Sequence, residues 1–244
     1  MAIYDAHSPC SLRPERTRTR SHSNPMLTAT LDAFAKEVGE GQLLGAIVFC
    51  SLERPIDDLI RHSLSLGPYH RGAAGEWSHT FLIAGPYAAR RTPILDCTIR
   101  DSKTGGVGWN ENLLDVLRTG IANSGGIYAG FAEDYDDPRI HPVAVKWLPA
   151  LAPADREAIV AAANELKNQG YHYDIPGLIR EFVRLLTQIP VPAGKRLLFC
   201  SGFCQKAYRS ALGPAGDFTD KVSDEDTTPD DIWYSPVGEA YRIR

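Results

Sequence analysis

The feature that most constrains the fold is a series of short apolar segments, each bounded by glycine, proline or charge. The segment "VAVKW" alternates, so that Val143, Val145 and Trp147 share one face of an extended chain. Segments of this length and composition are typical of strands, and they lie at 46–49, 79–84, 93–96 and 143–147. Helical periodicity instead marks 27–38, 55–67, 153–170, 177–189 and the residues that follow Cys200. The pattern predicts a single α+β domain.

The N-terminal region differs in composition from the rest of the chain. Residues 1–25 carry four arginines against Asp5 and Glu15, with few large apolar side chains. Such a segment buries too little surface to offset the entropy of ordering, so we expect a flexible basic tail. Residues 26–244 show no internal repeat or linker and are expected to form a single domain.

Composition disfavours several classes of partner. A net charge of -4 argues against a nucleic-acid-binding protein, which would need a basic surface. No apolar run approaches the roughly 18 residues of a membrane span, so we expect no integral membrane association. Residues 1–25 lack the apolar core of a signal peptide, which favours a cytoplasmic location, with export by a dedicated secretion system as the alternative.

A long polar stretch interrupts the apolar pattern. Residues 101–138 are rich in glycine, asparagine and aspartate and are predicted to be a loop around one short helix, "NLLDVLRTG". A loop of that length inside a compact domain is often functional.

The stretch "RLLFCSGFCQKAY" places Cys200 and Cys204 four residues apart, where an apolar run gives way to a helical pattern. Cys200 would begin the helix, whose N-terminus lowers a thiol pKa and favours the nucleophilic thiolate. Cys204 would lie one turn later on the apolar face, as a small core residue. No second Cys/His pair completes a zinc site, and five cysteines make a poor disulfide framework. The alternative is that both cysteines fill the core.

A cysteine nucleophile needs a base and a group that orients the base. In "WSHTFLI", His79 stands at the start of an apolar strand and could face a cleft. In "PILDCTI", Asp96 lies within an apolar run, where a buried carboxylate needs a hydrogen-bonded partner. An imidazole N–H is a natural partner, and the three residues would form a Cys–His–Asp relay. The alternatives are a structural histidine and an aspartate that caps a turn before Thr98.

The order of these blocks over residues 42–237 resembles that of the circularly permuted NlpC/P60 group of papain-like cysteine hydrolases. The similar blocks are "GAIVF", with Ala46 in place of the usual Asp, then "WSHTFLI", "PILDCTI" with "GGVGW", the "GYHYD" that ends a long helix, "FCSGFCQKAY" and "TTPDDIWYSP". Two residues depart from the usual pattern: Gly202 stands where the family has Glu, and Asp96 replaces a more common Glu.

The resemblance implies a papain-like α+β fold, with helices packed on a small antiparallel sheet. It also implies a hydrolase that cleaves an amide bond through an acyl-enzyme, with a peptide or muropeptide of peptidoglycan as the expected substrate. It assigns the nucleophile to Cys200, the base to His79 and the orienting group to Asp96. It also implies substrate-binding roles for Tyr173, Ser78 and Trp77, and neither a metal nor an organic cofactor. Tyr173 has an alternative as an aromatic anchor of the scaffold. For the function, the alternatives are a lipid or ester acyl hydrolase or acyltransferase with the same residues, and a catalytically inactive binding domain.

Overall fold

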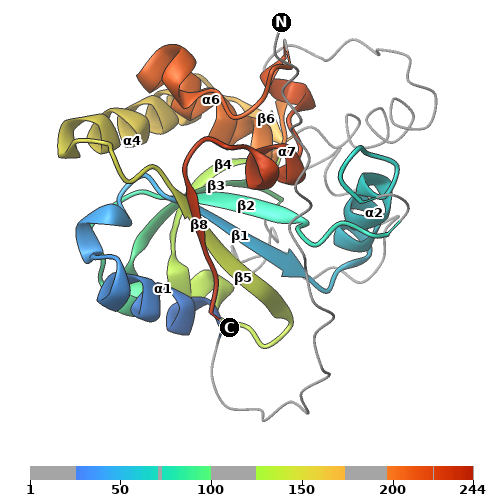
Figure 1. The fold of residues 1–244 in the computed structure, drawn as a ribbon, viewed down its shortest axis with the longest axis horizontal. Coiled ribbons are helices and arrows are strands. Elements are labelled where there is room, and N and C mark those ends of the chain that lie inside the picture. The colour runs from blue at the N-terminus through green and yellow to red at the C-terminus, as the bar shows by residue number, and fades with distance from the viewer. Residues whose placement is uncertain (1–25, 71–72, 100–124, 174–196, 222, 244) are drawn as a thin grey trace, which may run out of the picture.

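The computed structural model describes residues 26–70, 73–99, 125–173, 197–221 and 223–243, and it shows a curled sheet with helices on both faces (Figure 1). The strands are β1 (Ile47–Leu52), β2 (His79–Ile83), β3 (Pro93–Thr98), β4 (Gly126–Phe131), β5 (Ile140–Trp147), β6 (His172–Tyr173), β7 (Leu197–Leu198) and β8 (Glu239–Tyr241). The α-helices are α1 (Met26–Glu37), α2 (Pro55–Leu64), α4 (Pro153–Asn168), α6 (Cys200–Leu212) and α7 (Pro229–Tyr234).

The eight described strands form one sheet in the order β7-β6-β4-β3-β2-β1-β5-β8. Neighbouring strands pair antiparallel, except for β6 and β7, which are parallel. The α+β prediction is confirmed, although the sheet is larger than the small one that the resemblance implied.

Alternation along the central strand divides the core into two layers. Ile47 and Phe49 of β1 pack into the layer under α4 and α6, whereas Val48 and Cys50 pack into the layer covered by α1. All four side chains are fully buried, because β1 is covered on both faces of the sheet. Figure 1 shows the same division, with α1 on one side of the sheet and α4 and α6 on the other.

Helix α6 positions the candidate nucleophile. It begins one residue after β7, and Gly213 follows its last residue with a φ of 60°, a conformation that favours glycine. Phe203, Cys204 and Ala207 form its apolar face and are buried in the layer shared with α4. The middle of α6 is therefore packed against the sheet. Its first residue, Cys200, lies at the edge of this apolar contact.

The predicted elements agree with the described structure at most positions. The four expected strands are β1, β2, β3 and β5, and the expected helices at 27–38, 55–67, 153–170 and after Cys200 are α1, α2, α4 and α6. The helix expected at 177–189 and the tail at 1–25 lie outside the described residues.

One prediction is wrong in its described part. Residues 126–131 of the expected loop form strand β4, and a short 3-10 helix, η3 (Ala132–Tyr135), follows it. Glycine and alanine at three of its six positions hide the apolar alternation by which strands are recognised. Pairing with β3, in which Tyr128 lies opposite Asp96, holds this segment extended.

Candidate active site

The three residues expected to form a relay come from three elements and lie together. His79 is the first residue of β2, Asp96 lies in the neighbouring β3, and Cys200 is the first residue of α6. His79 Nε2 lies 2.9 Å from Asp96 Oδ1, and both side chains are buried. Cys200 lies near enough to the imidazole to raise the pKa of His79. The structure thus places the expected nucleophile, base and carboxylate in one cluster.

Tyr135, which the sequence did not suggest, is the fourth member of this cluster. Its hydroxyl lies 3.0 Å from His79 Nε2 and donates a hydrogen bond to Asp96 Oδ2. Its ring stacks on the imidazole, with centroids 5.6 Å apart and planes 17° apart. Because the hydroxyl proton goes to Asp96, the hydroxyl oxygen can only accept from Nε2, which must therefore carry a proton. Nδ1 is then the nitrogen that can accept the proton of Cys200.

The charges around the imidazole favour its protonated form. Burial lowers the pKa of His79, but the Asp96 carboxylate and Cys200 together raise it by more, to about 10. An imidazolium beside a cysteine is the charge that stabilises a thiolate. The raised pKa of His79 therefore favours an imidazolium next to Cys200.

The position of Cys200 on its helix supports the same charge state. Phe199, which precedes it, offers no side-chain cap, so the first N–H groups of α6 are not occupied by one. Free amides at a helix N-terminus stabilise negative charge. Burial raises the pKa of the Cys50, Cys97 and Cys204 thiols well above the usual value, which keeps them protonated. Among the described cysteines, Cys200 is thus the candidate nucleophile.

A pocket opens beside Cys200 between two walls that are far apart in the sequence. One wall comes from α2, and the other is the segment that leads into α7. Most of the larger side chains in the pocket are apolar, and the polar ones are hydroxyl groups and one carboxylate. The lining residues are Ile60, Ser63, Leu64, Ser78, Tyr173, Phe199, Cys200, Ser201, Asp226, Thr227, Thr228 and Pro229.

Two of the three residues expected to bind substrate line this pocket. Ser78 and Tyr173 do so, and the Tyr173 ring packs edge-on against Phe199 with centroids 6.3 Å apart. Trp77 instead lies fully buried in the core, where its ring contacts Phe49 and Trp233. Its place in the structure is that of a packing residue next to the site.

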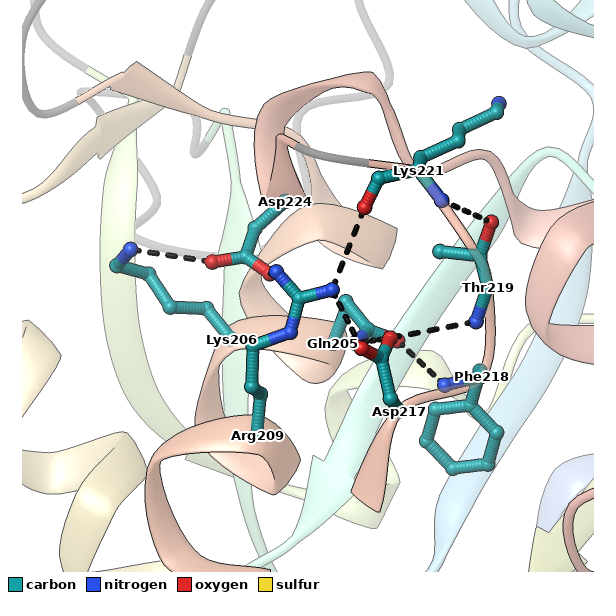
Figure 2. A network of polar contacts seen from close by, with 8 residues as sticks. All are labelled: Gln205, Lys206, Arg209, Asp217, Phe218, Thr219, Lys221 and Asp224. Carbon is teal, nitrogen blue, oxygen red and sulfur yellow. Dashed lines mark hydrogen bonds and ion pairs between the residues drawn. The ribbon is translucent and has the colours of Figure 1, made fainter. Parts of the chain in front are cut away.

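A polar network anchors the residues that follow α6 to the helix itself (Figure 2). Arg209 forms ion pairs with Asp217 at 2.7 Å and with Asp224 at 3.0 Å, and it donates to the Lys221 carbonyl at 3.3 Å. Lys206 adds a second cation on Asp224, at 3.2 Å. These contacts fix Asp217, Lys221 and Asp224, shortly before the second wall of the pocket.

That wall is also tied to the residue next to the candidate nucleophile. Ser201 Oγ donates to the Thr227 carbonyl at 2.6 Å. At the start of α7, Thr228 caps the helix by accepting from the Asp231 N–H at 3.2 Å, and Asp231 accepts from the Thr228 N–H at 2.7 Å. Substrate would therefore enter between a wall fixed to α6 and a wall formed by α2.

Within the described ranges, no group of three or more histidine, cysteine, aspartate or glutamate side chains could hold a metal ion, and no helix is long and apolar enough to cross a membrane. Comparisons with models of protein families, with curated proteins and with solved structures found no match.

Proposed function

We propose that the protein is a papain-like cysteine hydrolase that acts through Cys200, His79 and Asp96, with Tyr135 supporting the carboxylate. The observation that carries the proposal is the imidazole of His79, held between a buried carboxylate and a cysteine at a helix N-terminus. A nucleophile, a base and an orienting group in this order are the parts that covalent acyl transfer requires. A cysteine at the start of a helix beside an antiparallel sheet also supports the papain-like assignment of the fold, with residues 26–244 as its single domain.

The proposed reaction begins from a thiolate–imidazolium pair, in which His79 Nδ1 already carries the proton of Cys200. The Cys200 sulfur then attacks the carbonyl carbon of an amide, a C–S bond forms, and the carbonyl oxygen becomes an oxyanion. The N–H groups at the start of α6, where Phe199 makes no side-chain cap, point toward this end of the helix and can stabilise that charge. The C–N bond breaks as the imidazolium gives its proton to the leaving amine, which leaves an acyl-enzyme on Cys200.

Water completes the cycle. His79 takes a proton from a water molecule whose oxygen attacks the thioester carbon, and the C–S bond breaks to release the acid. The proton then returns from the imidazolium to the Cys200 sulfur. Asp96 and Tyr135 hold the ring so that Nδ1 faces the sulfur in both half-reactions.

A peptide or muropeptide is the substrate that the resemblance favours, and one observation favours a second candidate. Ile60, Leu64, Phe199 and Pro229 give the pocket beside Cys200 an apolar lining. Such a pocket suits an acyl chain better than a charged stem peptide. An ester or thioester acyl hydrolase with the same residues is therefore the second proposed function.

Mass spectrometry of a trapped acyl-enzyme tests the proposal and separates the two candidates. The protein would be mixed with stem peptides in one series and with p-nitrophenyl esters of increasing chain length in another, then quenched with acid. We expect an adduct on Cys200 that is missing in Cys200→Ala. An adduct from the peptides supports the amidase, and one from long-chain esters alone supports the acyl hydrolase. No adduct from either panel would support an inactive binding domain.

A further inference from the structure

The two walls of the pocket are joined by contacts outside the pocket itself. His70, six residues beyond the end of α2, places Nε2 2.6 Å from Asp230 Oδ2 in α7. Tyr69 donates from its hydroxyl to Asp231 Oδ1 at 3.3 Å, and its ring stacks on Tyr234 with centroids 4.9 Å apart. Residues 160 positions apart in the sequence therefore connect the α2 wall to the α7 wall.

Gly75 allows the α2 wall to pack closely against this junction. Its N–H donates to the Arg61 carbonyl at 2.8 Å. A Cβ at Gly75 would lie 2.8 Å from the Leu64 side chain and 3.4 Å from Asp230 Oδ2. Real Cβ atoms do not approach other atoms to 2.8 Å, so only glycine lets this segment pack between Leu64, which lines the pocket, and Asp230.

The α7 wall does not depend on this junction for its own position. Lys221 Nζ donates to Asp231 Oδ2 at 2.6 Å and to the Asp226 carbonyl at 2.8 Å, and Ser201 holds the Thr227 carbonyl. Loss of the His70 contact would thus free α2 and the residues after it, and it would leave the wall beside Cys200 in place.

The His70–Asp230 contact is also one that can open at modest cost. Asp230 is 1% exposed, and its Oδ1 has no hydrogen-bond partner among the described residues. A buried carboxylate that is only half satisfied gains solvation when it is released. Burial raises the pKa of Asp230 to about 6, with His70 opposing the rise and Asp231 and Glu76 adding to it. Tyr69, which bonds to Asp231, and Tyr234, whose ring contacts His70, lie in the same junction.

Cys200 is only 3% exposed while this contact is closed. We propose that His70 and Asp230 form a clasp that holds α2 over the pocket and so determines the size of the group that reaches Cys200. The two residues would determine specificity without contact with the reacting atoms. This inference rests on the proposed function in one respect, which is that Cys200 is the reactive thiol. Small acyl groups would pass the closed clasp, whereas bulky ones would need it to open.

The test compares the labelling of Cys200 by a small and by a bulky thiol reagent, iodoacetamide and fluorescein-5-maleimide, with the site of labelling read by peptide mapping. The ratio of the two rates removes the dependence on thiolate content, because both reagents need the thiolate. The variants are His70→Gln and Asp230→Asn, each checked for an unchanged circular dichroism spectrum. His141→Gln is the matched control, because His141 pairs with Glu53 at 3.0 Å and neither residue lines the pocket.

We expect the bulky-to-small ratio to rise roughly tenfold in both clasp variants, as the open state becomes populated, and to stay unchanged in the control. In the wild type the bulky-to-small ratio should also rise as the pH falls below about 6, where Asp230 takes up a proton. This measurement needs no variant, so it tests the clasp even if a variant does not fold. A ratio that stays constant in both variants and across this pH range overturns the clasp. Slow labelling of Cys200 by iodoacetamide in the wild type would overturn the proposed function instead. The bulky-to-small ratio would then still show whether the clasp limits access to Cys200.

Discussion

The hydroxyl of Tyr135 donates a hydrogen bond to the carboxylate of Asp96, whose other oxygen lies 2.9 Å from His79 Nε2. Both oxygens of a carboxylate with no exposed surface are thus occupied, one by the candidate base and one by tyrosine. Since a buried carboxylate is costly unless it is hydrogen-bonded, the Tyr135 hydroxyl offsets part of the cost of burying Asp96 next to the imidazole.

Tyr135→Phe should therefore weaken the site while keeping the ring stacked on His79. Leaving a buried acceptor unpaired should cost about 1–3 kcal/mol of unfolding free energy, and the iodoacetamide labelling rate of Cys200 should fall several-fold. Urea unfolding and peptide mapping measure the two effects. The control is Tyr87→Phe, which removes a hydroxyl bonded to Asp32 on the exposed surface. Equal labelling rates in the two variants would show that Tyr135 has no part in the relay.

The relay residues should act as a unit. Cys200→Ala should abolish turnover and His79→Ala should nearly do so, while Asp96→Ala should lose on the order of a hundredfold. The double variant Cys200→Ala/His79→Ala should be no worse than Cys200→Ala alone. These rates would be measured with the substrate that forms the acyl-enzyme. Full activity in His79→Ala would remove that residue from the mechanism.

The pH dependence follows from the raised pKa of His79. The folded state keeps a proton on this ring up to about pH 10, whereas the unfolded chain releases it near 6.5. The stability that His79 contributes is therefore fully present below 6.5 and is lost as the pH rises through this window to about 10. In Asp96→Asn the pKa of His79 should fall, because the main group that raises it is gone. An NMR titration of the imidazole measures this directly, and an unshifted titration in the variant would contradict the assignment.

Tyr173 tests the pocket rather than the chemistry. It lies 8% exposed among the lining residues, and its backbone N–H bonds to the Gly125 carbonyl, so its backbone is held independently of its hydroxyl. If the hydroxyl binds substrate, Tyr173→Phe should lower kcat/KM roughly tenfold, about 1.4 kcal/mol, with little change in melting temperature. A variant that melts earlier and turns over normally would mean that Tyr173 is part of the scaffold.

The sequence was most informative where chemistry and local pattern coincide. Cys200 at the junction of an apolar run and a helix, and His79 at the head of an apolar strand, both lie where the pattern predicted. Tyr135 was not predictable because β4 and η3, which bring it to Asp96, carry a weak apolar signal, and their structure depends on pairing with β3. Local sequence describes which residues can share a face, but it does not show which distant segments meet.

The pocket illustrates the same limit. Its walls at α2 and at residues 226–229 each have an ordinary sequence, and only the fold places them beside Cys200. Trp77, two residues before His79 in the chain, was expected to bind substrate. The strand that carries His79 to the site leaves Trp77 in the core against Trp233.

The most direct test of the central claim is a limiting reaction with iodoacetamide at pH 7, in which peptide mapping identifies the first cysteine to be labelled. The account predicts that Cys200 reacts first and that His79→Ala slows this reaction greatly, since the imidazolium that stabilises the thiolate is lost. Burial should keep Cys50, Cys97 and Cys204 slow in both proteins. Labelling of another of these cysteines ahead of Cys200, or an equal rate in His79→Ala, would contradict the assignment of Cys200 as an activated nucleophile.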